Sequence, residues 1–179
     1  MSIRETLAQM GITLPQAAAP VASYVPVVIA GGLAHVSGQL PFIDGQLVTG
    51  KLGDDVGLDR GAQAARACGL MILAQLDAAG IAFDQIERVV KLGAFVASSD
   101  GFTDQPKVAN GASDLMVSVF GDKGKHARSA VGVAELPLAD CARLATAFSA
   151  AKLARLGPHL PAPEQVRALA ASVQIRSMS

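Results

Sequence analysis

Aromatic side chains are scarce in this chain. It has no tryptophan, one tyrosine and six phenylalanines, so aromatic residues make up only 4% of its 179 residues. The core must therefore be built from aliphatic side chains, which agrees with a hydrophobic content of 51%. The shortage also leaves few rings on which nucleic acid bases could stack.

Long apolar runs are missing as well. A membrane-spanning helix needs about 18 or more consecutive apolar residues, and no such stretch occurs. We therefore expect a soluble protein with no membrane partner. Residues 1–10 include Arg4 and Glu5 and lack the apolar core and small-residue cleavage site of a secretory signal. This predicts a cytoplasmic location.

Neither sign of charge dominates, because 15 Lys and Arg residues balance 15 Asp and Glu residues. Such a chain has no global field to attract phosphate backbones, so we expect no nucleic acid partner. Only two cysteines are present, Cys68 and Cys141. They lie far apart in apolar surroundings, which favours buried thiols over a disulfide or a metal site.

The length suits one domain with additions at its ends. We expect an N-terminal extension over residues 1–20, a domain over 21–153 and a C-terminal tail over 154–179. The tail has three prolines and then a helix-like run, which is typical of a packing arm rather than of a second domain.

Turn signals predict two hairpins near the start of the domain. Gly31-Gly32 separates the apolar runs 25–30 and 33–36, and Asp44-Gly45 divides residues 42–48. Both dipeptides suit the positive φ angles of two-residue turns. The second turn predicts a third short strand or a further hairpin arm.

Two helices and two strands follow. Apolar residues at three-and-four spacing predict a helix from Asp59, as N-cap, to Gly80, and a second helix from Thr103 or Asp104 to Gly121. Strands are predicted over 86–96 and 128–136. Residues 142–151 fit either a helix or a strand.

This order predicts an α+β fold with a mostly antiparallel sheet and two helices on one face. The opposite face of the sheet has no cover within the chain. Self-association is the natural way to bury an aliphatic face of that size.

General motifs of chemistry are absent: there is no Gly-rich phosphate loop, no histidine pair at metal-ligand spacing and no nucleophile elbow. Three segments are distinctive, namely Tyr24–Pro26 with Val36–Pro41, Phe102–Ser113 and His126–Leu138. Together they resemble the reactive-intermediate deaminase family (RidA, YjgF-like), in order and with matching spacing, from about Tyr24 to Leu138.

The resemblance implies a chorismate-mutase-like fold that assembles as a homotrimer with clefts between subunits. Members of the family hydrolyse reactive enamines and imines to 2-oxo acids and ammonia without a cofactor or metal of their own. An older name of the family is L-PSP endoribonuclease. The expected partners are therefore further copies of the chain and a small carboxylate, a 2-imino or 2-oxo acid.

The resemblance assigns roles to several residues. Arg128 aligns with the arginine that grips the substrate carboxylate, a task that suits its planar fork of donors; the alternative is a surface arginine in a salt bridge. Tyr24 and Asn110 match residues that line the cleft, and Gly38 matches a glycine whose backbone approaches the ligand. Ser129 is expected to help hold the carboxylate, with a plain strand hydroxyl as the alternative.

Two positions depart from the family pattern. Ala130 stands where many members have a cysteine. Arg143 stands, by counting from Arg128, where members have the glutamate that activates water, and a permanently charged arginine cannot accept a proton. Two hypotheses about function follow.

In the first hypothesis the protein is an imine or enamine deaminase. Arg128 binds the substrate carboxylate, while backbone groups near Gly38 and Ala130 polarise the imine and orient water.

In the second hypothesis the protein is a non-catalytic trimer in which Arg128 and Arg143 together hold a dicarboxylate or 2-oxo acid. Endoribonuclease activity, a third reading, rests on the family's older name, and the balanced charge and few aromatics argue against it.

Overall fold

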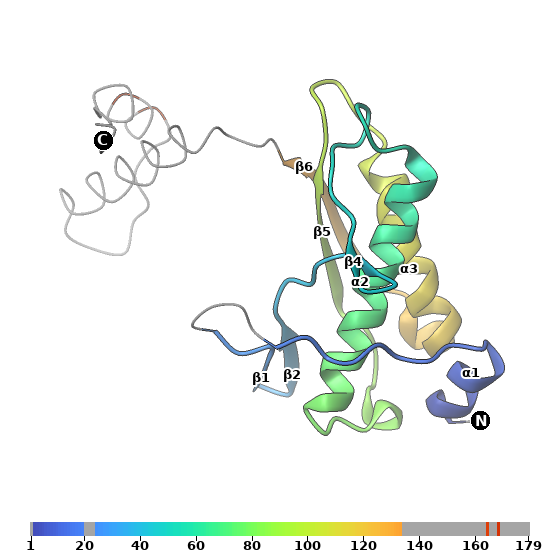
Figure 1. Cartoon of the computed structure of the whole chain (residues 1–179). Helices are drawn as coiled ribbons and strands as arrows, with labels where there is room; N and C mark the ends of the chain where they lie inside the picture. The colour runs from blue at the N-terminus through green and yellow to red at the C-terminus, as the bar shows by residue number, and fades with distance from the viewer. Residues whose placement is uncertain (1, 20–23, 134–163, 165–167, 169–179) are drawn as a thin grey trace, which may run out of the picture. The chain divides into compact units, whose positions relative to one another are not determined.

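The structure is a computed structural model in which residues 2–19, 24–133, 164 and 168 are described. The chain forms two compact units, residues 1–134 and 135–179, and the elements below all belong to the first (Figure 1). Arg143, Cys141, the segment 142–151 and most of the predicted tail lie outside the described residues. The expected boundaries at residues 20 and 153 stay predictions.

The elements follow one another in this order: α1 (Ile3–Gln9), β1 (Val27–Ala30), β2 (Leu33–Val36), β3 (Phe42–Ile43), β4 (Gln46–Leu47), α2 (Leu58–Ala78), the 3-10 helix η1 (Phe83–Gln85), β5 (Lys91–Ala97), α3 (Gln105–Phe120), the 3-10 helix η2 (Gly121–Gly124) and β6 (Ala127–Val133). No helix among the described residues is long and apolar enough to cross a membrane.

Both predicted hairpin turns are confirmed. β1 and β2 pair antiparallel, with Gly31 and Gly32 at φ +56° and +75° between them. β3 and β4 pair in the same way around Asp44 and Gly45, at φ +51° and +77°. Two successive positive φ angles match the right-handed twist of a hairpin, so each dipeptide fixes the register of its strands.

The boundaries of α2 and α3 agree with the sequence except at one cap, whereas α1 was not predicted. α3 follows Asp104 and stops at Gly121, whose φ is +60°, as predicted. α2 is followed by Gly80, at φ +76°. The predicted N-cap of α2 was wrong: Gly57 occupies that position and Asp59 lies in the first turn, where its charge still favours the positive end of the helix dipole.

α2 and α3 pack with their backbones close together. A Cβ on Gly111 of α3 would lie 1.9 Å from the carbonyl oxygen of Ala62 in α2, and one on Gly69 would lie 2.9 Å from a methyl of Leu115. The core beside this contact is aliphatic, and its fully buried side chains are Leu73, Leu115 and Met116. The glycines therefore set the separation of the two helices.

β5 and β6 run parallel, from Lys91 opposite Ala127 to Ala97 opposite Val133. A parallel pair needs a crossover, and α3 supplies it. The described strands thus form three two-stranded sheets, two of them antiparallel. The predicted α+β class is confirmed.

The β5–β6 pair has one covered and one open face. Val96 is buried beside Val108 of α3, whereas Phe95, on the opposite face, is 78% exposed and its strand partner Val131 is 45% exposed. An aliphatic and aromatic face without cover is therefore present in the described part of the chain, as the sequence predicted.

The N-terminal helix α1 packs on this core rather than standing apart. Leu7 is buried with the side chains of the main cluster, and the backbone N–H of Ile3 donates to Asp84 Oδ1 at 3.0 Å. Arg4 forms an ion pair with Asp77, and its guanidinium lies 5.6 Å above the centre of the Phe83 ring. Residues 3–9 are thus fastened to α2 and η1.

Candidate functional site

Arg128 is the centre of the site. It is the second residue of β6 and lies opposite Leu92 of β5, so its side chain is on the face that α3 covers. Its Nη1 donates to Asn110 Oδ1 at 2.8 Å and to Ser113 Oγ at 3.0 Å. Asn110 and Ser113 are three residues apart on α3, and therefore share one side of that helix.

His126 extends this group of side chains. Its Nδ1 lies 2.6 Å from the carbonyl oxygen of Gly124, and its Nε2 lies 3.1 Å from Ser113 Oγ. A carbonyl oxygen can only accept, so the partners assign the proton to Nδ1 and leave Nε2 as the acceptor for the Ser113 hydroxyl. We call Asn110, Ser113, His126 and Arg128 the Arg128 cluster.

The partners of Arg128 in the cluster carry no charge. The ion pairs in the described part of the chain include Arg4 with Asp77, Lys107 with Asp104 and Lys125 with Asp122. Within that part of the chain no carboxylate pairs with Arg128. Both hydrogens of Nη1 are engaged, and no described residue accepts from Nε or Nη2. The edge formed by Nε and Nη2 is a two-donor fork that matches a carboxylate.

The structure places the other predicted residues as follows. Ser129 is next to Arg128 in the strand, so it points to the opposite face, beside Gly93. Ala130 returns to the face of Arg128, opposite Ala94. Of the predicted site residues, only Asn110 is in direct contact with Arg128 among the residues that the structure describes.

Tyr24 precedes β1 and Gly38 follows β2, so both flank the open end of the β1–β2 hairpin, which is a separate two-stranded sheet. Tyr24 is exposed, and nothing lies within 4 Å of the place that a Cβ on Gly38 would take. In the described residues no hydrogen bond joins this hairpin to the Arg128 cluster.

Sequence reasoning missed Ser113 and His126 as site residues. Both were visible at the ends of distinctive segments, since Ser113 closes one run and His126 opens the next. What the sequence could not show is that β6 lies beside β5 and so brings His126 and Arg128 against α3.

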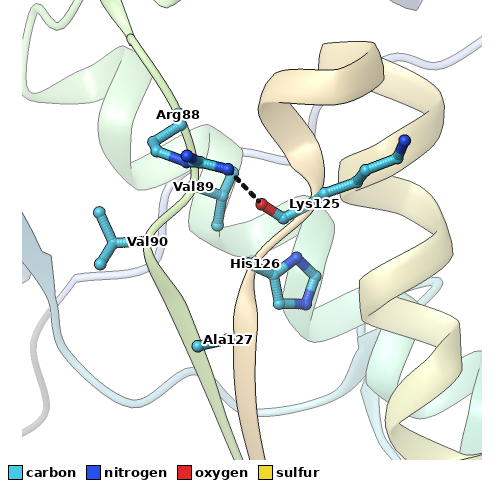
Figure 2. Close-up of a pocket in the computed structure, with 6 residues that line it drawn as sticks. All are labelled: Arg88, Val89, Val90, Lys125, His126 and Ala127. Atoms are coloured by element: carbon cyan, nitrogen blue, oxygen red, sulfur yellow. Dashed lines mark hydrogen bonds between the residues drawn. The ribbon is translucent and has the colours of Figure 1, made fainter.

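An open depression of about 470 Å³ lies beside the cluster, where the segment before β5 runs along the segment before β6 (Figure 2). Its lining residues are Arg88, Val89, Val90, Lys125, His126 and Ala127. Figure 2 shows Arg88 reaching the carbonyl oxygen of Lys125, at 3.4 Å, and the His126 ring on the far side of its strand from Val90.

Of the two basic side chains that line this depression, Lys125 has a charged partner outside it. Lys125 pairs with Asp122 at 2.6 Å, which raises the pKa of Lys125 and lowers the pKa of Asp122. Arg88 is held by one long hydrogen bond, at 3.4 Å, whereas Arg128 is oriented by two shorter ones, at 2.8 and 3.0 Å, so Arg128 is the better candidate for ligand recognition.

Cys68 is a structural thiol. It lies on α2, and its Sγ donates to the carbonyl oxygen of Gln39 at 3.3 Å. Burial raises the pKa of Cys68 to about 11, so the thiol is neutral at physiological pH. Its contact fastens the segment after β2 to α2. No group of three or more His, Cys, Asp and Glu side chains suited to a metal ion occurs in the described ranges.

The fold and these residues agree with a defined family. The chain belongs to the family described as "YjgF/chorismate mutase-like, putative endoribonuclease", whose model matches residues 4–154. The resemblance drawn from the three sequence segments is thereby confirmed.

Particular relatives can be named. The chain is 53% identical over 137 residues to the protein TCP17 of Trypanosoma cruzi, a match covering 75% of this chain and 86% of TCP17. The crystal structure of Atu1372 from Agrobacterium tumefaciens, described as of unknown function, is 47% identical with a TM-score of 0.68, covering 76% of this chain and 84% of that protein. A "putative endoribonuclease" from Shewanella oneidensis is 31% identical with a TM-score of 0.70, covering 77% and 92%.

Proposed function

We propose that this protein binds small 2-imino and 2-oxo acids through Arg128 and hydrolyses the imino acids, with their enamine tautomers, to 2-oxo acids and ammonia. One observation carries the proposal. Arg128 is oriented by two neutral acceptors at 2.8 and 3.0 Å, while its Nε–Nη2 edge has no carboxylate among the described residues. A guanidinium held in place with its charge uncompensated is suited to a carboxylate ligand.

We further propose that the site is completed in a homotrimer. The exposed side chains Phe95 and Val131 share one face of β5–β6, and Val28, Ile29 and Leu33 of the β1–β2 hairpin are exposed as well. A single chain that left all of these in water would be prone to associate. Association would allow Tyr24 and Gly38 of one subunit to approach Arg128 of another.

The chemistry needs a route for two protons from the attacking water to the imine nitrogen. Water adds to C2 of the imine while one of its protons passes to that nitrogen; the hydroxyl proton of the resulting carbinolamine then moves to the nitrogen as ammonia leaves and the carbonyl forms. In this proposal, backbone groups near Gly38 and Ala130 polarise the imine and orient the water, without a cofactor and in the cytoplasm. Asn110, Ser113 and His126 offer no carboxylate beside Arg128.

The lack of a carboxylate beside Arg128 among the described residues favours a second candidate function, in which the protein is a trimer that binds small carboxylates without catalysis. Counting from Arg128, Arg143 falls where the family resemblance places the water-activating glutamate. In this alternative Arg143 joins Arg128 in holding a dicarboxylate or 2-oxo acid.

One experiment separates the two candidates. A pyridoxal-phosphate-dependent dehydratase would generate 2-aminoacrylate, and the rate of ammonia release would be followed with and without the protein. A deaminase accelerates the release, and Arg128→Ala removes the acceleration. A binder shows calorimetric binding of 2-oxo acids but no acceleration, and Arg143→Glu then creates activity.

The same preparations would be offered single-stranded RNA at two salt concentrations. RNA cleavage that survives Arg128→Ala, together with no binding of any 2-oxo acid, would refute both candidates.

A further inference from the structure

Ser113 and His126 form a chain of hydrogen bonds, here called the relay, that runs from Arg128 to the carbonyl oxygen of Gly124. The proposed function gives these two side chains no role. His126 Nδ1 donates to the Gly124 carbonyl oxygen at 2.6 Å, and in the neutral ring a proton on Nδ1 leaves Nε2 as an acceptor. Nε2 then accepts the only proton of the Ser113 hydroxyl, across 3.1 Å. Ser113 Oγ can therefore present only lone pairs to Arg128 Nη1, at 3.0 Å.

The histidine removes an ambiguity in this contact. A serine hydroxyl rotates freely and can act as donor or acceptor. Without His126, the Ser113 proton could point toward Arg128, where two donors would oppose each other. With the Nε2 lone pair in place, the hydroxyl has one favourable orientation and the guanidinium has a fixed acceptor.

The backbone anchors the relay at its far end. Gly124 is buried, and a Cβ there would lie 2.2 Å from the carbonyl oxygen of Met116 in α3, so η2 is tight against that helix. The neighbouring Lys123 carbonyl oxygen accepts from the N–H of Val89 at 2.8 Å, and Ala127 N–H donates to the Val90 carbonyl oxygen at 3.0 Å. The acceptor for His126 therefore has a fixed position relative to α3.

The second feature of the relay is that it is neutral. Asn110 and Ser113 occupy both hydrogens of Nη1 without contributing a negative charge. A carboxylate at either position would accept the same hydrogen bonds but would compensate the guanidinium and repel an anionic ligand. Orientation and charge compensation are thus separated in this cluster.

We propose that Asn110, and Ser113 held by His126, are positioning residues that orient Arg128 while preserving its full charge, and that this makes the site selective for anionic over neutral ligands of the same shape. The proposal rests on the proposed function, because it assumes that Arg128 receives the ligand carboxylate. Beyond that function, Asn110, Ser113 and His126 govern the affinity of Arg128 for the ligand carboxylate, and their neutrality keeps the charge of Arg128 available to the ligand.

The decisive comparison is Asn110→Asp against Asn110→Ala in the full chain, with calorimetric binding of a 2-oxo acid and its neutral amide. The aspartate keeps the acceptor beside Arg128 but adds a charge at contact distance. We expect it to weaken binding of the acid by at least about 10-fold, more than the alanine does, while its melting temperature is equal to or above that of Asn110→Ala. A purely structural role gives the opposite order, with the alanine binding worse.

His126→Gln and His126→Leu test the relay. Glutamine can place an oxygen near the position of Nε2, so its affinity should stay within about 2-fold of the native protein. Leucine removes the acceptor, and loss of one neutral hydrogen bond should weaken binding about 5-fold. Should leucine fail to fold, Ser113→Ala against Ser113→Thr gives the same comparison. Equal affinities across either pair would overturn the relay.

The assigned tautomer has its own readout. In ¹⁵N–¹H spectra of the histidine rings, the signal that disappears in His126→Gln should show a protonated Nδ1 and a bare Nε2 at neutral pH. A protonated Nε2 would overturn the relay. Arg128→Ala separates this failure from failure of the proposed function: if that variant still binds the acid, Arg128 is not the carboxylate clamp at all.

Discussion

Gly111 is the residue whose replacement most directly tests how the fold holds the site. A Cβ at this position would lie 1.9 Å from the carbonyl oxygen of Ala62, whereas ordinary contacts of a Cβ begin near 3.4 Å. The shortfall is 1.5 Å, the difference between these two distances, and it is met by backbone of α2 that cannot rotate away. α2 and α3 must separate or tilt to admit a methyl group.

Two opposing terms decide the sign of the effect. Replacing a glycine by alanine inside a helix favours folding by about 1 kcal/mol. Overpacking a tight interface typically costs about 1–3 kcal/mol and sometimes more. Because the clash at Gly111 is with backbone, we expect an overpacking cost near the upper end of that range, so that Gly111→Ala destabilises the protein by about 2 kcal/mol net.

Gly69→Ala is the matched control, since it is also helical and also at the interface of α2 and α3. Its Cβ would meet the end of the Leu115 side chain at 2.9 Å, and a rotamer change can relieve such a contact. Urea denaturation of both variants, followed by circular dichroism, gives the free energies of unfolding. A Gly111→Ala protein as stable as Gly69→Ala would refute the backbone-clash argument.

The same variant links packing to function. Gly111 is the neighbour of Asn110 in α3, and Ser113 follows two residues later. A displacement of α3 by even a fraction of the missing 1.5 Å would lengthen both hydrogen bonds to Arg128. We therefore expect carboxylate affinity to fall in Gly111→Ala and to stay near the native value in Gly69→Ala.

Three further outcomes are expected. Arg128→Ala should weaken 2-oxo acid binding by about 10-fold or more with little change in melting temperature, because a charged hydrogen bond contributes about 1.5–3 kcal/mol. Arg128→Lys should restore little of the affinity, because lysine lacks the planar fork. Full rescue by lysine in calorimetry would show that only the charge matters. In a Cys141→Ser background, Cys68 should resist iodoacetamide at pH 8, because burial raises its pKa from 9.0 to about 11 and keeps the thiol neutral; fast alkylation of the folded protein at pH 8 would contradict this. The contribution of the neutral thiol to folding stability is present below pH 9 and is lost as the pH rises toward 11. Phe95→Asp should yield monomers in sedimentation equilibrium, because Phe95 lies on the open sheet face, whereas Val117→Asp, on the exposed side of α3, should leave the assembly intact; a native protein that is itself monomeric would end the trimer proposal.

Residues of the site differ in how far the sequence could identify them. Arg128 and Asn110 were identified because they lie inside segments that resemble the family, and the structure places them in hydrogen-bond contact. Ser113 and His126 occur in the same segments, but their importance comes from a pairing between α3 and the start of β6 that no local pattern encodes. For Asp59 the local pattern was misleading. Aspartate is a favourable N-cap residue, but the N-cap of α2 is Gly57, immediately before the helix.

By itself, the sequence determined the turns, the presence and C-terminal ends of α2 and α3, the family and the mainly aliphatic character of the core; it did not predict α1. These follow from short-range effects: Gly31-Gly32 and Asp44-Gly45 tolerate positive φ, and apolar spacing selects a helical or extended backbone. Only the tertiary structure decided that β5 and β6 run parallel, that Ser129 faces away from Arg128, and that a neutral relay ending at Gly124 supports the guanidinium. Strand partners and side-chain acceptors are chosen by contacts between residues distant in sequence, and their free energies depend on which surfaces the folded chain brings together.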